Sequence, residues 1–219
     1  MREKSPDHIN RLDELVERLL SVEDGKNRRL IGIVGPPGSG KSTLSERLEK
    51  VLNARAPGCC ATVPMDGFHY DNMVLEELGL LPRKGAPETF DIDGLLALHQ
   101  RLRTNAKGAV AIPIFDRSME LSRASARLID QAIPIILVEG NYLLLQAPGW
   151  EHLAEFYDLT ISIDVADDEL ERRLTDRWLE QGLPPERART KVSENDLPNA
   201  RVVKANSAEP DIWFSSSDD

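Results

Sequence analysis

A glycine-rich segment, GPPGSGKS at residues 35–42, carries the strongest chemical signal in the sequence. Its spacing of glycine, lysine and serine fits a loop whose backbone N–H groups turn inward and bind phosphate oxygens. Lys41 would reach the β- and γ-phosphates of a nucleotide, and the Ser42 hydroxyl would bind Mg²⁺. The predicted nucleotide-binding residues are Gly35, Gly38, Ser39, Gly40, Lys41, Ser42 and Thr43.

A carboxylate follows the next apolar stretch. Residues 59–65 have the composition of a buried strand, and VPMDGFH at residues 63–69 ends it. Because the carboxyl ends of strands face the ligand crevice in open α/β sheets, Asp66 is expected beside the glycine-rich loop. There it could orient an acceptor hydroxyl and take its proton. The alternative is that Asp66 caps the following turn. His69 could bind the acceptor or pack in the interior, and the sequence leaves both open.

A second acid ends the most apolar stretch of the chain. IPIILV, residues 133–138, predicts a strand, and Glu139 follows it directly. An acid at this point can support Mg²⁺, so Ser42 and Glu139 form the predicted metal site. Glu139 also counts among the predicted substrate-binding residues, with Asn141 and Tyr142 after it.

Arginines cluster on a helix expected over residues 167–181. Arg173 and Arg177 are four residues apart and share a face. A mobile helical lid could bring them onto phosphates and neutralise charge during catalysis, which makes both catalytic candidates. The alternative is a solvated basic surface, and it stays open at this stage.

Strands and helices alternate along the chain, which predicts a mostly parallel sheet covered on both faces. We expect one α/β domain over residues 1–219. Asp7 is predicted to cap a helix over residues 9–20, and Asp93 another that carries His99 at its surface or boundary. Further elements are expected as strands at 30–34, 110–115, 159–165 and 211–214, and as helices at 42–52 and 122–130.

The composition excludes several classes of function. A net charge of −10 argues against a bulk electrostatic grip on nucleic acid or an anionic membrane. No apolar run has the length of a membrane span, and the N-terminal residues lack the apolar core of a signal peptide. The adjacent Cys59 and Cys60 suit burial in a reducing compartment, so we expect a cytoplasmic protein. A small-molecule substrate is the expected partner, and a homodimer is allowed.

Three further segments carry a family resemblance: VPMDGFH, RKGAPETFD at residues 83–91, and VEGNYLLL at residues 138–145. With the glycine-rich loop, they resemble the phosphoribulokinase/uridine kinase family of P-loop kinases, which includes bacterial pantothenate kinase. The chain looks closest to small bacterial members associated with sugar transport or named fructokinases. The resemblance covers roughly residues 25–214, and VPMDGFH and RKGAPETFD are specific to this family.

The resemblance implies a P-loop NTPase fold with five parallel strands in the order 2-3-1-4-5, flanking helices and a helical lid. It makes Asp66 the base and Glu139 the second acid. It places residues 83–91, called here the acceptor loop, and residues 112–118 along the acceptor pocket. The lid is expected near residues 172–199, and NDLPNA at residues 195–200 forms the lid return. The acceptor-binding residues implied in these segments are Arg83, Lys84, Asp116 and Arg117, and Asn206 is expected near the adenine.

These features together predict an ATP-dependent kinase acting on a hydroxyl of a sugar-like acceptor, with fructose as the first candidate. Pantothenate and uridine remain alternatives, although Asp116 and Arg117 stand where those kinases differ. A nucleotide-driven ATPase switch is the rival from another class. A GTPase is disfavoured because the chain has no N-K-x-D motif.

Overall fold

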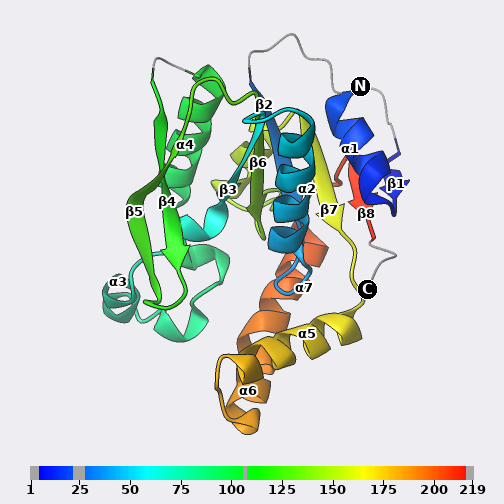
Figure 1. Cartoon of the computed structure of the whole chain (residues 1–219). Coiled ribbons are helices and arrows are strands. Elements are labelled where there is room, and N and C mark those ends of the chain that lie inside the picture. Colours follow the sequence, from blue (N-terminus) through cyan, green and yellow to red (C-terminus); the bar gives the residue numbers. More distant parts are fainter. Residues whose placement is uncertain (1–4, 22–27, 106–107, 216–219) are drawn as a thin grey trace.

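The computed structural model describes residues 5–21, 28–105 and 108–215. Within these residues a six-stranded sheet has the order β1-β8-β7-β2-β6-β3, and its pairings are all parallel (Figure 1). The strands are β1 (Asp7–Ile9), β2 (Arg29–Val34), β3 (Cys60–Pro64), β6 (Ile135–Gly140), β7 (Leu159–Ile163) and β8 (Ile212–Phe214). The predicted parallel sheet is therefore confirmed.

Helices cover both faces of this sheet, as Figure 1 shows for α2 and α4. The helices are α1 (Leu12–Leu20), α2 (Lys41–Arg55), α3 (Asn72–Glu77), α4 (Ile92–Thr104), α5 (Asp167–Glu180), α6 (Pro185–Lys191) and α7 (Leu197–Asn206). Short 3₁₀ segments are Met65–Phe68, Leu81–Arg83, Pro87–Thr89 and Trp150–Phe156. Among the described residues, no helix combines the length and apolar character needed to cross a membrane.

Alternation along the central strands builds a separate core on each face. In β2, Ile31 and Ile33 belong to the cluster that includes α1 and α2, whereas Leu30 and Val34 belong to the cluster that includes α4. Successive side chains of a strand point to opposite faces, so a strand buried on both sides reads as a continuous apolar run. This double burial holds the carboxyl ends of the strands, and the loops on them, in fixed places.

The sheet has one strand more than the family resemblance implied. The five expected strands have the expected order, and β1 extends the sheet by pairing with β8 in parallel. The prediction that Asp7 caps a helix is wrong, because Asp7 lies in β1 and its N–H donates to the carbonyl of Asp211 at 2.9 Å. The helix begins only at Leu12, after Arg11. Hydrogen bonding to the edge of β8 stabilises this short segment as a strand more than its local propensity stabilises a helix.

A two-stranded antiparallel hairpin, β4 (Val110–Asp116) and β5 (Leu121–Ile129), stands beside the main sheet. Its second strand contradicts the helix predicted at 122–130. The residues of β5 are mostly exposed, so their sequence lacks the alternation that marks a half-buried strand. Pairing with β4 decides the conformation, and a tertiary contact overrides local propensity.

Helix α4 differs from expectation at two residues. Asp91, rather than Asp93, caps it, because the Asp91 carboxylate accepts a hydrogen bond from the N–H of Gly94 at 2.9 Å. His99 is fully buried instead of lying at the surface or boundary. Its Nδ1 lies 2.8 Å from the carbonyl of Leu95, and its Nε2 lies 2.8 Å from the hydroxyl of Tyr157. Burial lowers the pKa of His99 to about 4.

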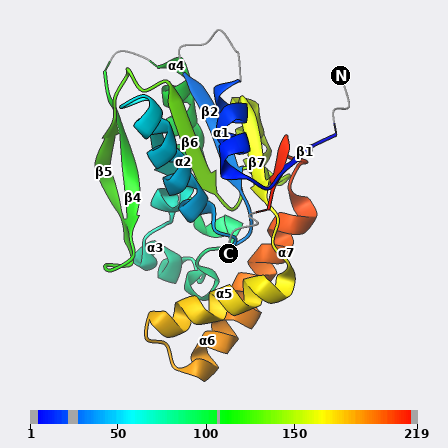
Figure 2. The same cartoon turned by 45° about the vertical axis from the view of Figure 1, so that its right-hand side comes forward.

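Helices α5, α6 and α7 form an arm that projects beyond the carboxyl edge of the sheet (Figure 2). A π-helical turn, Val192–Asp196, joins α6 to α7. A small apolar cluster holds the arm together through Leu170, Leu174, Val192 and Ala200. The arm contains the segment expected as the lid, whose mobility remains a prediction.

Candidate active site

The glycine-rich loop lies between the end of β2 and the start of α2, as the motif requires. Gly38 and Gly40 have φ angles of 79° and 93°, in the left-handed region that favours glycine. At Gly35, a Cβ atom would come within 2.6 Å of the Ser39 Oγ, so a side chain there would displace that hydroxyl. That buried Oγ has no hydrogen-bond partner among the described residues, which suits a loop built to receive a polar ligand.

Glu139 lies beside this loop because β6 is the neighbour of β2 in the sheet. The Ser42 hydroxyl donates to Glu139 Oε1 at 3.3 Å. A hydroxyl and a carboxylate oxygen at one point suit a hard divalent cation such as Mg²⁺. Burial raises the pKa of Glu139 to about 7, with a further contribution from Asp66, while Lys41 opposes the rise. These two residues therefore fit the predicted metal site.

Lys41 rests inside the loop itself, where its Nζ donates to the carbonyl of Pro36 at 2.9 Å. Burial lowers the pKa of Lys41 to about 8, and the negative charges of Glu139 and Asp66 oppose that shift. An additional anion near the ammonium would favour its protonated form. The loop thus presents a desolvated cation, which is the environment in which a phosphate is bound most strongly.

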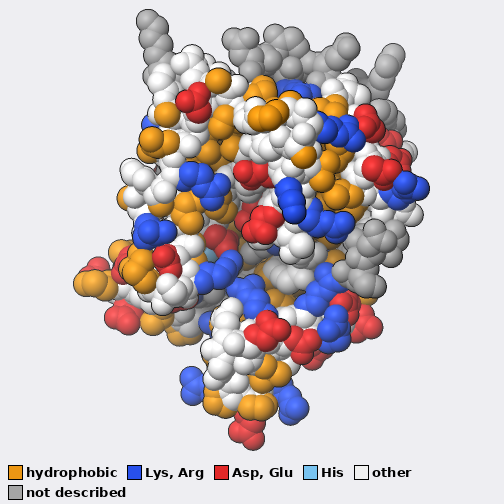
Figure 3. All heavy atoms as spheres, viewed as in Figure 1, with side chains coloured by type: hydrophobic (Ala, Val, Ile, Leu, Met, Phe, Trp, Pro, Cys, Tyr) orange, Lys and Arg blue, Asp and Glu red, His pale blue; other side chains and the backbone are white. Residues whose placement is uncertain are grey.

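A cavity of about 360 Å³ opens between the loop, the strand ends, the hairpin turn and the arm. We call it the main cavity. Many of the predicted site residues line it: Gly38, Gly40, Lys41, Ser42, Thr43, Asp66, His69, Lys84, Arg117, Glu139, Asn141, Arg173 and Arg177. Figure 3 shows Lys and Arg side chains gathered where the arm meets the body of the protein. Segments distant in sequence thus form one site.

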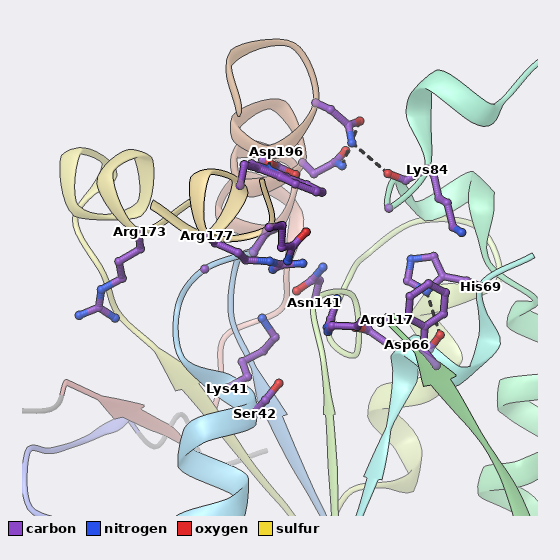
Figure 4. A pocket seen from close by; sticks show the side chains of 18 of the residues that line it. Lys41, Ser42, Asp66, His69, Lys84, Arg117, Asn141, Arg173, Arg177 and Asp196 are labelled. Carbon is purple, nitrogen blue, oxygen red and sulfur yellow. Dashed lines mark hydrogen bonds and ion pairs between the residues drawn. The ribbon is translucent and has the colours of Figure 1, made fainter. Parts of the chain in front are cut away.

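Figure 4 shows the two ends of the main cavity. Lys41 and Ser42 mark its phosphate end. Asp66, His69 and Arg117 lie together at the other side, which we call the acceptor end. The Asp66 carboxylate accepts a hydrogen bond from Arg117 at 2.8 Å. Asp66 thus faces the cavity and is reachable by a hydroxyl, as the prediction of a catalytic base requires.

His69 and Lys84 surround an aromatic ring at the acceptor end. The ring of Phe115 lies 5.0 Å from that of His69 and 4.9 Å from the Lys84 Nζ. His69 Nδ1 contacts the backbone carbonyl of Asp66 at 2.8 Å. Burial lowers the pKa of His69, although Asp66 opposes the shift. His69 therefore packs on aromatic rings and also lines the cavity, and its binding of the acceptor stays a prediction.

Arg173 and Arg177 occupy different surroundings despite their shared helix. Arg173 forms an ion pair with Glu169 at 2.6 Å and points to the far side of the glycine-rich loop (Figure 4). Arg177 is half-buried and lines the main cavity, and burial lowers the pKa of its guanidinium. In the described residues, its guanidinium has no ion-pair partner and lies over the ring of Trp178 at 5.6 Å. Arg177 is the better placed of the two for an anion.

Three predicted acceptor residues have their polar groups occupied by the protein. The Arg83 guanidinium donates to Asn195 and Asn199, and the Tyr142 hydroxyl donates to the carbonyl of Gly85 at 2.7 Å. Asp116 accepts from the Ser118 hydroxyl at 2.6 Å and pairs with Arg123 at 3.3 Å. None of these three residues is among those that line the main cavity, so their direct contact with the acceptor stays a prediction.

A second cavity of about 320 Å³ lies on the other side of the glycine-rich loop. It shares Gly40, Thr43 and Arg173 with the main cavity. Its remaining walls are Ser39, Leu44, Arg47, Ile163, Asp164, Val165, Ala166, Glu169, Phe214 and Ser215. Asn206, which was expected near the adenine, is the last residue of α7 and lines neither of these two cavities. Its side-chain amide donates a hydrogen bond to the carbonyl of Val202.

Several lining residues were not predicted individually. Trp178, Gln181 and Lys191 come from the arm, and Glu120 comes from the hairpin turn. No local pattern distinguishes these residues, because their exposure to the cavity depends on where the arm and hairpin pack. NDLPNA was the one available signal, since it marked the segment that contributes Asn195, Asp196 and Asn199.

Comparison with known proteins agrees with this site. A family model described as an AAA domain matches residues 31–192. A protein of Schizosaccharomyces pombe named "putative uridine kinase" is 34% identical, over 95% of this chain and 91% of that protein. Pantothenate kinase of Enterococcus faecalis is 32% identical over 68% of this chain, a match that spans 49% of that enzyme.

A solved structure from Silicibacter sp., described as a "putative fructose transport system kinase", has 42% sequence identity and a TM-score of 0.87. The match covers 93% of this chain and 98% of that one. The chain belongs to the phosphoribulokinase/uridine kinase family of P-loop kinases. It is accordingly a phosphotransferase with an alcohol group as acceptor, and the kinases of this class use ATP.

Proposed function

We propose that this kinase transfers the γ-phosphate of ATP to a hydroxyl group of a small polyhydroxylated molecule, with fructose as the first candidate. The observation that carries the proposal is the position of Asp66. This carboxylate lines the same cavity as Lys41 but lies at its other end, beside side chains rich in hydrogen-bonding groups. Such a cavity can hold the phosphates of a nucleotide and an acceptor together.

In the proposed reaction, Asp66 orients the acceptor hydroxyl and takes its proton while the oxygen bonds to the γ-phosphorus and the bond to ADP breaks. Lys41 leaves the carbonyl of Pro36 and neutralises charge on the transferring group. Arg177 adds a second positive charge from the arm, and closure of the arm excludes water from the site. Arg117 must share Asp66 with the incoming hydroxyl, because the ion pair occupies one carboxylate oxygen.

We assign the Mg²⁺ site to Ser42 and Glu139, whose oxygen atoms lie together at the phosphate end. When bound, Mg²⁺ would neutralise negative charge on the phosphates. The second cavity is the proposed adenine site. It adjoins the glycine-rich loop, and apolar side chains such as Ile163 and Phe214 offer surfaces for a planar base.

The sugar-like acceptor is supported by the groups at the acceptor end. His69, Arg117 and Asn141 offer forked or paired hydrogen-bonding atoms, which clustered hydroxyls satisfy well. The similarity to a protein described as a fructose transport system kinase supports fructose among such molecules. Arg117, whose side chain is 54% exposed, also favours a second candidate, an acceptor with a carboxylate such as pantothenate. Uridine is a third, through the Schizosaccharomyces pombe relative named as a putative uridine kinase.

A coupled assay of ADP release tests the proposal with purified enzyme, ATP and a panel of sugars, polyols, nucleosides and pantothenate. We expect the highest specificity constant for a sugar. A specificity constant for pantothenate or uridine above that of every sugar would overturn the acceptor assignment. ATP turnover that does not depend on any acceptor would instead support the nucleotide-driven ATPase switch.

A further inference from the structure

Arg83 connects the acceptor loop to the lid return. Its Nη1 donates to Asn195 Oδ1 at 3.0 Å, and its Nη2 donates to Asn199 Oδ1 at 3.1 Å. Both amides are buried, with 4% and 1% of their surface exposed. A planar guanidinium presents two such bonds in a fixed fork, whereas the donors of a lysine ammonium radiate from one flexible nitrogen and lack that geometry. The contact therefore fixes both the distance and the orientation between two segments more than 100 residues apart in sequence.

A further hydrogen bond joins the same two segments, and here the lid return donates to the acceptor loop. The Asn195 amide donates to the carbonyl of Lys84 at 2.9 Å. The next residue, Gly85, is held through its carbonyl by the hydroxyl of Tyr142. Lys84 and Gly85 themselves line the acceptor end of the main cavity. An acceptor molecule that contacts this stretch therefore presses on backbone that is directly bonded to the lid return.

From the lid return, contacts continue to the arm's arginine. Asp196 follows Asn195 in the π-helical turn, and its carboxylate accepts a hydrogen bond from the indole of Trp178 at 2.6 Å. The Arg177 guanidinium lies over that indole ring. π-helical turns inside helices are sites where the backbone can shift between hydrogen-bonding patterns. Acceptor loop, π-helical turn and Arg177 thus form one continuous set of contacts.

We propose that Arg83 is a positioning residue, which holds the lid return on the acceptor loop so that occupation of the acceptor end aligns Arg177 with the phosphates. This proposal rests on the proposed function of Arg177 and of the main cavity. Arg83 itself does not touch the acceptor in this scheme, since it is not among the residues that line the main cavity. Its Nη1 and Nη2 donate to Asn195 and Asn199, and its Nε lies 3.8 Å from a carboxylate oxygen of Glu88. It acts through the two asparagines, and we call this junction the latch.

The acceptor-independent test is hydrogen exchange of residues 192–199 in the presence of the non-hydrolysable analogue AMP-PNP. We expect Arg83→Ala to accelerate backbone exchange there about tenfold. The reason is that the buried side-chain amides of Asn195 and Asn199 lose the guanidinium while the overall fold persists. Arg83→Lys, which keeps the charge but loses the fork, should behave similarly. Arg189→Ala is the matched control, since Arg189 is an exposed arginine on the same arm. It should leave the exchange unchanged.

The kinetic test uses a double-mutant cycle with the panel member that the wild-type enzyme phosphorylates best. Arg83→Ala and Asn199→Ala should each lower kcat/KM for the acceptor about tenfold, and the double variant should lose little more than either one. The affinity for AMP-PNP, measured by calorimetry, should stay within about twofold. Additive losses would assign Arg83 to direct acceptor binding and would overturn the latch.

The two proposals fail in different ways. Wild-type protein that binds AMP-PNP but phosphorylates no panel member contradicts the proposed acceptor, while the exchange comparison still decides the latch. Unchanged exchange in both Arg83→Ala and Arg83→Lys contradicts the latch whatever the acceptor is. If Arg83→Ala fails to fold, Arg83→Lys provides the same comparison, because it retains the side-chain bulk and charge.

Discussion

Replacement of Asp66 by asparagine separates catalysis from structure at the acceptor end. Asparagine keeps the size of the side chain and one oxygen that can accept from Arg117, but it cannot take a proton at neutral pH. The ion pair that is lost joins side chains with 54% and 28% of their surface exposed. Pairs this exposed contribute about 0–1 kcal/mol to stability, so the variant should fold normally.

The expected loss in turnover is much larger than this change in stability. A positioned general base contributes about 10²–10⁴ in rate. Since each factor of ten corresponds to about 1.4 kcal/mol, the activation barrier should rise by about 3–5 kcal/mol. Nucleotide affinity should hardly change, because Asp66 lies at the acceptor end rather than at the phosphate end.

The assay combines acceptor-dependent ADP release with calorimetric affinity for AMP-PNP. Asp71→Asn is the matched control: it makes the same substitution on the next turn, where Asp71 caps α3 through the N–H of Met73 at 2.9 Å. Asparagine caps helices about as well as aspartate, so this control should retain turnover. Turnover of Asp66→Asn within a few-fold of wild type would refute the reasoning and make Glu139 the candidate base.

Four other results are expected. Lys41→Ala should lower turnover by about 10²–10³ in a folded protein, and wild-type turnover would contradict the assignment of the loop. The value of kcat/KM for ATP should fall as the pH drops below about 7, where Glu139 is protonated, and as it rises above about 8, where Lys41 is deprotonated. A flat pH profile would contradict both roles. The free energy of unfolding should decline by up to about 3 kcal/mol between pH 6.5 and 4, because unfolded His99 takes up a proton that the buried ring resists. Chemical denaturation at both pH values measures this decline, which should be smaller in His99→Leu. Hydrogen exchange over residues 172–199 should slow when AMP-PNP and an acceptor bind, and unchanged exchange would argue for a rigid surface arm.

Much of the site could be predicted from the sequence because its geometry is local or follows from sheet topology. The glycines at 35–42 prescribe the curl of the loop, which depends only on backbone conformation at those residues. Asp66 and Glu139 could be located because each directly follows a buried strand, and parallel strands bring their carboxyl ends to one edge. The Ser42 and Glu139 contact is a direct result of that rule.

Features that depend on a distant partner could not be predicted. The strands β1 and β5 lack distinctive patterns of their own and form because β8 and β4 offer edges to pair with. His99 was expected at the surface or boundary, yet the Tyr157 hydroxyl bonds to its ring and allows full burial. In each case the free energy comes from contacts between segments far apart in the chain.

Arg83 shows most clearly where prediction from the sequence ends and the tertiary structure decides. The sequence determined that this residue belongs to a segment beside the acceptor, and that a phosphate-binding loop and two strand-end acids belong to the same site. Only the tertiary structure decided that its guanidinium is taken up by Asn195 and Asn199 of the lid return. A side chain of this length can satisfy its donors in any of several directions. The packing of the arm against the body selects one of them, and no pattern local to Arg83 encodes that choice.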